Sequence, residues 1–380
     1  MTQYIIRRAL LMIPTLIGVS LLITALLRLL PGDAVDILVT ENAIGGGSEA
    51  FKQLVDERLA GQGIDPAQAS FGERIEVESE LIAAQLEKEG RDFATATDAQ
   101  KQEARNTLAF DTYKNQIRRS LGLDKNYFQQ WWSWATGVVR GDFGTSIVGS
   151  RPVGEELKRR IPVSIELGVL AMLASVMLAL PVGVISALKQ DTPLDYGTRS
   201  FAIAVLALPS FFVATLVIAL AARLFNYSFP IFYKDFWKDP VENLELVVVP
   251  ALILGFGLSG SLMRLTRAQM LEVLRQDYMR TARAKGLAER VAILRHGVRN
   301  AFIPVVTIIG LQIPVLIGGS LVLEQIFGIP GVARYLFESI IRRDFPPIIA
   351  INILVALTIV VANLVVDVMY AYLDPRIRFA

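Results

Sequence analysis

The sequence predicts an all-α polytopic membrane protein with six transmembrane helices. Hydrophobic residues make up 53% of its 380 residues, and the mean hydropathy of +0.46 is too high for an ordinary soluble protein. Six apolar runs have the length of membrane spans, and basic residues collect in alternate connections between them. A soluble enzyme is therefore excluded.

Composition also limits the kinds of site and partner. The formal net charge is only +2, which gives no reason to expect nucleic acid as a partner. The chain has no cysteine, so it has no disulfides, thiolate metal sites or cysteine nucleophiles. We expect no metal and no cofactor to be bound by this chain.

We compare the length of each of the six apolar runs with the roughly 20 residues that a helix needs to cross a bilayer. The fourth run is the weakest, because it is short and contains Pro250. The runs cover residues 9–30, 163–188, 200–222, 247–263, 301–323 and 347–370.

Flanking charge sets the orientation of these spans. If the six spans alternate, four basic sites fall on one side of the membrane, and the positive-inside rule makes that side cytoplasmic. Both termini are then cytoplasmic. The four sites are Arg7-Arg8, Lys189 with Arg199, the loop 264–300, and Arg376 with Arg378.

The alternating topology also gives the domain organisation. Residues 1–30 form the cytoplasmic end and the first span, and residues 31–162 form an extracytoplasmic region. Residues 163–374 form the core with the other five spans, and residues 375–380 form a cytoplasmic tail. Arg7-Arg8 could instead open a secretory signal peptide, but the apolar run that follows is too long for one.

The extracytoplasmic region contains a helical insertion at about 41–122. Gly45-Gly46-Gly47 predicts a flexible joint, after which Ser48 caps a helix. A helix at about 72–89 has one apolar face, and Thr97-Asp98-Ala99-Gln100 has the capping-box pattern of a further helix. A small helical subdomain, a partly ordered hairpin and a docking surface all remain open. The apolar face consists of Ile75, Val77, Leu81, Ile82 and Leu86.

Three of the four tryptophans lie close together in residues 127–134. Aromatic rings of this kind prefer the boundary between membrane and water. We expect an interfacial amphipathic helix at about 126–140, on the outer leaflet. A stacking platform for a sugar or a base is the alternative, but it lacks nearby polar partners.

The connection 264–300, after the fourth span, is the most informative segment of the chain. Its helical period ends at Gly286, so a short helix followed by a turn presents a surface to the cytoplasm. The single histidine, His296, is expected to be a solvated helix residue. Nine basic residues face only three acidic ones here: Arg264, Arg267, Arg275, Arg280, Arg283, Lys285, Arg290, Arg295 and Arg299.

Two nucleotide motifs can be excluded. Gly255-Phe256-Gly257-Leu258-Ser259-Gly260 matches the dinucleotide fingerprint, but it lies in an apolar span, where small residues let helices approach closely. The sequence contains no Gly-Lys dipeptide, so the phosphate-binding loop is absent. If ATP drives transport, another subunit must hydrolyse it.

Polar residues within the spans are candidates for a pore lining or for pairing between helices. A proton relay would need several acids facing one another at mid-depth, whereas these acids lie at opposite ends of their spans. The candidates are Glu166, Gln312, Asn352, Asn363 and Asp367.

The residues of the loop also resemble a known family. The run from Tyr278 to Leu287, followed by Arg295-His296 and by 299–304, resembles the cytoplasmic signature of bacterial ABC-importer permeases, closest to the dipeptide/oligopeptide/nickel branch. Supporting matches are Leu30-Pro31-Gly32-Asp33, Gly141-Asp142-Phe143-Gly144, Phe327-Gly328-Ile329-Pro330-Gly331, Arg343-Asp344-Phe345-Pro346 and Asp374-Pro375-Arg376. The general loop begins Glu-Ala-Ala, where this chain has Arg280-Thr281-Ala282. Residues 41–107 are extra relative to most relatives.

The resemblance implies a type I ABC importer permease fold in the bacterial plasma (inner) membrane. Its partners would be a second homologous permease, two cytoplasmic ATP-binding subunits that use ATP and Mg, and an extracytoplasmic solute-binding protein. By the same resemblance the ATPases would contact Asp277, Tyr278, Arg280, Thr281, Ala282, Arg283, Ala284, Lys285, Gly286, Leu287 and His296.

The expected function is therefore a permease subunit that forms half of the pore of an ATP-driven importer, with di- or oligopeptides as cargo. Nickel or another small solute is an alternative cargo. A proton-coupled secondary transporter is the alternative mechanism. A membrane-anchored scaffold would not explain six spans with so elaborate a loop.

Overall fold

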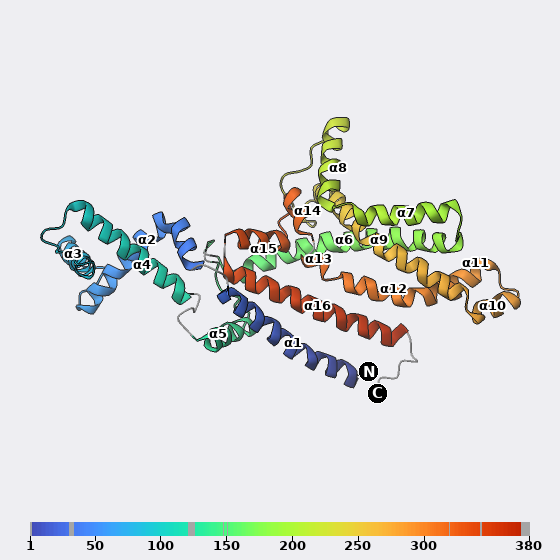
Figure 1. Cartoon of the computed structure of the whole chain (residues 1–380), viewed down its shortest axis with the longest axis horizontal. Coiled ribbons are helices and arrows are strands. Elements are labelled where there is room, and N and C mark those ends of the chain that lie inside the picture. The colour runs from blue at the N-terminus through green and yellow to red at the C-terminus, as the bar shows by residue number, and fades with distance from the viewer. Residues whose placement is uncertain are drawn as a thin grey trace.

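The computed structural model describes residues 2–29, 34–120, 126–146, 148–149, 151–318, 320–342 and 344–373. Within these ranges every regular element is a helix, and the only β-type pairing is an isolated bridge between Thr145 and Pro152. The molecule is elongated, with a helical bundle at one end and the helices α2, α3 and α4 at the other (Figure 1). The all-α prediction is confirmed.

Four helices of the bundle are long and apolar enough to cross a membrane. They are α6 (Val153–Leu188), α9 (Pro240–Leu274), the continuous helix Glu289–Gln312, and the part Phe345–Val366 of α16 (Phe345–Leu373). α1 (Thr2–Leu29) lies beside α16, as Figure 1 shows, and has an apolar stretch at Ile13–Ala25. These elements correspond to five of the six predicted spans.

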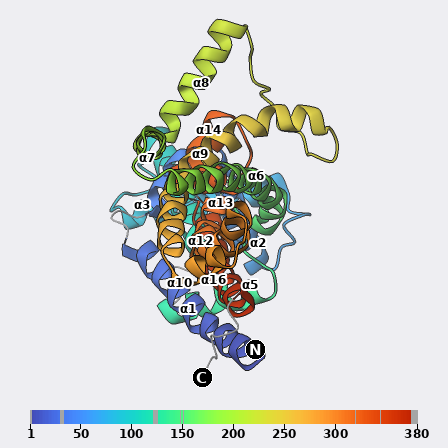
Figure 2. The same ribbon diagram turned by 90° about the vertical axis from the view of Figure 1, so that its right-hand side faces the viewer.

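The third predicted span, 200–222, is not one straight helix. α7 (Pro193–Ala207) and α8 (Ser210–Phe225) meet at an angle of 96°. Pro209 has no backbone N–H, and a residue before proline is forced out of the helical region, which is why Leu208 is extended with φ −84° and ψ 119°. α8 consequently projects sideways from the bundle, as Figure 2 shows.

The fifth span is displaced relative to the predicted range 301–323. Its helix already begins at Glu289 and runs through α11 (Glu289–Val291), the π-helix η1 (Ala292–Val298) and α12 (Arg299–Gln312). It ends before Pro314, and the short helices α13 (Val315–Gly318) and α14 (Leu321–Ile326) follow. Much of the predicted loop 264–300 is therefore helical extension of the neighbouring spans.

The centre of the bundle is the contact between α6 and α9, which run side by side. A Cβ placed on Gly255 would lie 2.5 Å from the carbonyl oxygen of Ala171, and one on Gly183 would lie 2.7 Å from the Cβ of Thr266. A Cβ on Gly260 would similarly meet Leu206 of α7 at 2.7 Å. The predicted role of the glycine pattern in close helix contact is confirmed for Gly255 and Gly260, whereas Gly257 has open space around it.

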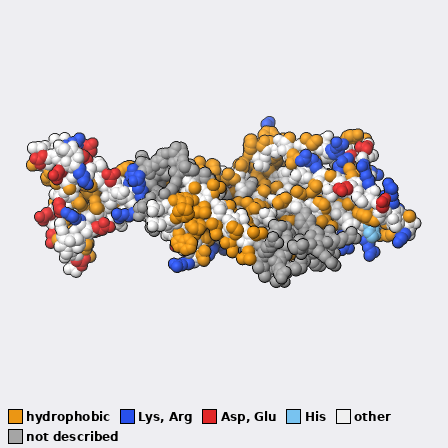
Figure 3. Space-filling model, turned by 60° about the horizontal axis from the view of Figure 1, so that its bottom comes forward, with side chains coloured by type: hydrophobic (Ala, Val, Ile, Leu, Met, Phe, Trp, Pro, Cys, Tyr) orange, Lys and Arg blue, Asp and Glu red, His pale blue; other side chains and the backbone are white. Residues whose placement is uncertain are grey.

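The insertion consists of α2 (Ala34–Gly61), α3 (Phe71–Lys88) and α4 (Asp98–Ser120). α2 runs without interruption through Gly45-Gly46-Gly47, so the predicted joint and the Ser48 cap are wrong. Helical hydrogen bonding overrides the weak propensity of glycine here, and Gly47 lies against Ala109 of α4. In Figure 3 acidic and basic side chains are interspersed over this end of the molecule.

The predicted bounds of α3 and the predicted start of α4 agree closely with the structure. Val77, Ile82 and Leu86 of the predicted apolar face are buried, but Ile75 is exposed. The capping box at Thr97 is present: its N–H donates to Oε1 of Gln100 at 2.8 Å, and its hydroxyl accepts from the N–H of Gln100.

The tryptophan-rich helix α5 (Tyr127–Val139) lies along α1. The indole N–H of Trp131 donates to the hydroxyl of Ser20 at 2.9 Å, and the Tyr127 hydroxyl donates to the carbonyl of Leu21. Phe128 and Trp132 are exposed. This mixture of one tethered face and one exposed aromatic face fits the predicted interfacial helix.

The α6–α9 contact generates a first prediction. Valine at position 255 should push the two helices apart, because overpacking in a tight contact costs about 1–3 kcal/mol. The melting temperature of the purified protein in lipid nanodiscs should fall by about 2–10 °C. Gly257→Val is the matched control and should leave it unchanged. Equal melting temperatures for both variants would contradict the proposed tight contact.

Candidate functional site

The segment after α9 forms the short helix α10 (Asp277–Ala284). Gln276 is extended before it, and Asp277 places a carboxylate in the first turn, where the helix dipole favours negative charge. Gly286 ends it at φ +79°. The N–H of Leu287 donates to the carbonyl of Ala282 and that of Gly286 to Arg283, which is the Schellman arrangement that requires a left-handed residue.

α10 has one buried and one exposed face. Met279 and Ala282, three residues apart, are buried, and the methyl group of Met279 lies near Gly297 of η1 together with that of Met270. The helix is thereby fixed against both adjoining spans. The exposed face carries the other predicted contact residues: Asp277, Tyr278, Arg280, Thr281, Arg283, Ala284, Lys285 and Gly286, with Leu287 half-buried.

The π-helix η1 contains His296, which is half-buried. The carbonyl of His296 accepts from the side-chain amide of Asn300 at 2.8 Å, and that amide also lies 3.3 Å from the Tyr278 hydroxyl. His296 is therefore adjacent to α10 through Asn300. Nothing in the hydrophobic period of the sequence indicated a π-helix.

The basic residues of the loop have different environments. Arg283 forms a two-point ion pair with Glu289, at 2.9 and 3.1 Å, and Arg280 lies 3.7 Å from Asp277. Figure 3 shows Lys and Arg side chains gathered at this end of the molecule. Within the described part of the chain, six of the nine have no ion-pair partner: Arg264, Arg275, Lys285, Arg290, Arg295 and Arg299.

The ninth, Arg267, faces the bundle instead of the cytoplasmic surface. Its guanidinium donates to both carboxylate oxygens of Asp195, at 2.7 and 2.8 Å. Asp195 is fully buried and also accepts from the Ser186 hydroxyl at 2.5 Å. This cluster joins α6, α7 and α9 immediately beside the loop. The sequence analysis counted Arg267 among the nine basic residues of the loop and did not identify Asp195.

A second buried carboxylate, Glu324 in α14, was also not identified from the sequence. It accepts hydrogen bonds from the hydroxyls of Ser320 and Ser164, at 2.6 and 3.1 Å, and from the N–H of Arg334 at 2.8 Å. A Cβ on Gly331 would overlap its carboxyl group. Phe327-Gly328-Ile329-Pro330-Gly331 is thus the turn that wraps this side chain.

The candidate pore residues whose side chains are described share no hydrogen-bond partner. The carboxylate of Glu166 accepts from the Tyr233 hydroxyl at 2.7 Å, and the amide of Gln312 bonds Ser261 and the carbonyl of Leu258 across to α9. Asn352 bonds the carbonyl of Ile348 in its own helix, and Asn363 is exposed. The side chain of Asp367 lies outside the described residues. Gln312 thus makes a contact between α12 and α9.

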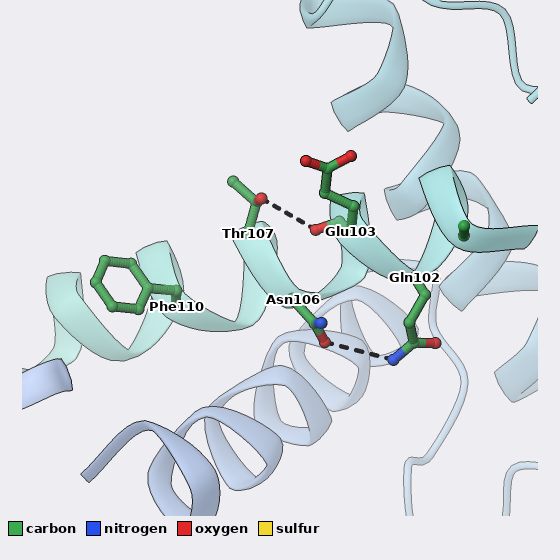
Figure 4. A pocket seen from close by; sticks show the side chains of 6 residues that line it. Gln102, Glu103, Asn106, Thr107 and Phe110 are labelled. Carbon is green, nitrogen blue, oxygen red and sulfur yellow. Dashed lines mark hydrogen bonds between the residues drawn. The ribbon is translucent and has the colours of Figure 1, made fainter. Parts of the chain in front are cut away.

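Among the described residues no three His, Asp or Glu side chains come together in a way that could hold a metal ion. Figure 4 shows one hollow, on α4, where Gln102 donates to Asn106 and the Thr107 hydroxyl donates to the carbonyl of Glu103. All of its lining residues come from a single helix, so it is a shallow part of the insertion's surface.

Comparison with known proteins gives a consistent result. A family model described as "Binding-protein-dependent transport system inner membrane component" matches residues 179–379, which include α10. The oligopeptide transport system permease protein AppB of Bacillus subtilis (strain 168) is 38% identical over 278 residues, covering 70% of this chain and 85% of AppB.

Two further proteins are similar. The glutathione transport system permease protein GsiC of Escherichia coli (strain K12) is 38% identical over 263 residues, covering 69% of this chain and 83% of GsiC. The crystal structure of an amino acid ABC transporter with histidines aligns with a TM-score of 0.45 and 15% identity, covering 57% of this chain and 94% of that one.

The turn at Gly286 generates a second prediction. Valine there must adopt a positive φ, at a cost of about 1–3 kcal/mol, although no neighbour lies within 4 Å of the added Cβ. The amides of residues 286 and 287 should exchange hydrogen faster, and uptake by the reconstituted transporter should fall while membrane insertion persists. Asparagine, which tolerates this conformation, should retain most of the uptake.

Gly197→Val is the matched control for this prediction. Gly197 also has no atom within 4 Å of an added Cβ, but its φ is not positive. Full uptake and unchanged exchange in Gly286→Val would disprove a role for the turn.

Proposed function

Because this chain belongs to the family of binding-protein-dependent transport system inner membrane components, we propose that it forms half of the translocation pore of an ATP-driven importer of di- or oligopeptides. It is a multi-pass membrane protein and the permease subunit of an importer, and it is not itself an enzyme. Peptides are favoured as cargo because the relatives are named for oligopeptide and glutathione transport.

The complete transporter would contain a second, homologous permease, two ATP-binding subunits and a solute-binding protein. The absence of a Gly-Lys dipeptide from the sequence supports placing ATP and Mg on the partner subunits. The chain would then bind neither. A single observation carries this assignment: an amphipathic helix, α10, is held between two spans and presents a basic face outward.

The proposed topology has six crossings and two cytoplasmic termini. α7 and α8 would together make the third crossing, despite the 96° bend between them. The basic residues near α10 favour the cytoplasm for this end of the bundle. The insertion α2–α4 extends from the opposite end of the bundle, so it would lie outside the cell (Figure 1).

ATP-driven movement would enter the permease at α10. Exposed Arg280 and Lys285 can pair with acidic groups of the ATPase, whereas Arg283 would first have to leave Glu289. Met279 anchors α10 to α9 and η1, and the Asp195–Arg267 pair joins α9 to α7. These helices would therefore tilt as a rigid body when the ATPases close.

A proton-coupled mechanism is less well supported by the same contacts. The carboxylate of Asp195 is bound by a guanidinium, and that of Glu166 by a tyrosine hydroxyl. Glu166 belongs to α6 and Asp195 to α7, and the two residues lie toward different ends of the bundle. They do not face one another as a relay of acids would require.

The insertion is proposed to contact the binding protein or to guard the pore mouth. Its own core, formed by Phe51, Val55, Leu59 and Val77, supports an autonomously packed unit. Its interspersed charges suit a wet, transient interface.

The two faces of α10 generate a third prediction. In this cysteine-free chain, Ala284→Cys should cross-link to the ATPase through a thiol-to-amine reagent, because Ala284 is exposed. Ala282→Cys should not, because Ala282 is 8% exposed on the opposite face. Cross-linked products can be identified by mass spectrometry of the purified complex.

Impermeant thiol reagents give the control for orientation. They should label Ala284→Cys only after the cytoplasmic side is opened. Labelling in intact cells, or equal cross-linking at both positions, would disprove the proposed site.

A fourth prediction concerns residues 48–107. Gly47 and Ala109 are neighbours, so a short glycine linker can replace this segment without separating its flanks. The deleted protein should still insert and assemble with the ATPases, and basal hydrolysis should persist. Stimulation by the peptide-loaded binding protein should weaken. Unchanged stimulation and uptake would exclude the docking role, and loss of assembly would indicate a structural one.

A further inference from the structure

A polar cavity of about 280 Å³ lies where four segments of the chain meet. The bridge between Thr145 and Pro152 brings these two residues together beside the start of α6. The remaining walls come from α15 (Val332–Ile341) and from the segment just before α16. The lining includes Ser146, Arg151, Glu156, Arg160, Tyr335 and Arg342, and we call it the Tyr335 cavity.

The acidic groups around the Tyr335 cavity are already occupied. Glu156 lies 3.3 Å from both Arg151 and Arg160, and Glu338 accepts from Arg334 at 2.8 Å. The carboxylate of Asp344 accepts from the Ser146 hydroxyl. Each of these three acids therefore has a partner within the protein.

The Tyr335 hydroxyl and the Arg342 guanidinium have no partner among the described residues. The hydroxyl of Tyr335 is buried and bonds no protein atom, although the residue is only 8% exposed. An orphaned buried hydroxyl is costly and therefore needs an explanation. The guanidinium of Arg342, on the rim, has no ion-pair partner.

The donors without a partner in the cavity favour an anion. Three guanidinium groups (Arg151, Arg160 and Arg342) and three carboxylates line it, and of these guanidinium groups only Arg342 has no ion-pair partner among the described residues. Arg160 also lies 4.5 Å from the ring centroid of Tyr335, which orients the phenol. A carboxylate fits both free donors, because a guanidinium and a hydroxyl can each donate to one of its oxygens.

The size and position of the cavity indicate what presents that carboxylate. Its volume is at the lower end of ligand pockets, so it accommodates one side chain better than a whole peptide. It lies beside the first turns of α6, at the end of the bundle that faces the insertion, where Figure 1 shows α15. In the proposed topology this is the outer surface on which a binding protein arrives.

We propose that the Tyr335 cavity receives an Asp or Glu side chain of the extracytoplasmic binding protein when that protein docks, with Arg342 and the Tyr335 hydroxyl as its donors. This inference rests on the proposed function, because it requires a binding protein as partner. It assigns to α15, together with Ser146 and Arg151, a docking role separate from that of the insertion.

The test uses the complete importer in lipid nanodiscs and measures its affinity for the binding protein by surface plasmon resonance. Arg342→Gln should weaken that affinity by about tenfold, and Tyr335→Phe by about three- to tenfold, while basal ATP hydrolysis stays unchanged. Arg159→Gln is the matched control: Arg159 is exposed, is not part of the cavity and should have no effect. Charge reversal should locate the partner group, because Arg342→Glu should be rescued by one acid-to-lysine substitution in the binding protein.

The outcomes separate this inference from the proposed function. If the wild-type complex binds and responds to no binding protein, both are overturned. If it does respond, but Arg342→Gln and Tyr335→Phe bind like the wild type, only the cavity's role is overturned. A variant that binds normally yet discriminates a peptide acid from its C-terminal amide would assign the cavity to cargo instead, and would also overturn the docking proposal.

Discussion

The close contact of α6 with α9 is the constraint on which the rest of the bundle depends. Within a membrane the hydrophobic effect does not drive helices together, so association relies on dispersion and on small residues that admit close approach. Gly183 and Gly255 provide that approach at two levels of the pair. Other elements attach to this frame: α7 through Gly260, and α12 through the amide of Gln312.

The buried Asp195–Arg267 pair connects the α6–α9 frame with the loop that contains α10. Separating a buried carboxylate from its guanidinium would leave an uncompensated charge, which is strongly unfavourable. α7 is therefore held to α9 at the end where α10 begins. Force applied to α10 reaches the spans through Met279 and this ion pair, because neither contact can slide without cost.

The number and order of the elements were largely predictable from hydrophobic runs and caps, as α3, α4, α5 and α10 illustrate. The directions in which the helices run were not predictable. Pro209 and Pro314 are visible in the sequence, but a hydropathy run does not show whether a proline kinks a span or turns it by 96°. The continuous helix through Gly45-Gly46-Gly47 is a case where neighbouring structure overrides local propensity.

The site was predictable where it depends on local order and not where it depends on distant contacts. The period of α10 and its glycine stop are local signals, and the turn predicted at Gly286 is present, with a positive φ. Asp195 meets Arg267 across 72 positions, and no pattern in the sequence joins them. The pore candidates were chosen by polarity alone. Polarity does not reveal that Gln312 bonds a neighbouring helix, whereas Asn352 bonds a carbonyl of its own helix.

Glu324 and Gly331 have a consequence for how this protein can vary. The carboxyl group of Glu324 occupies the space that a side chain at 331 would need, and in return it accepts the N–H of Arg334 at the start of α15. Substitutions at these two positions therefore depend on each other. Related sequences that replace this glycine must shorten or remove the acid in the same lineage, so covariation between the two columns would record the contact without any structure.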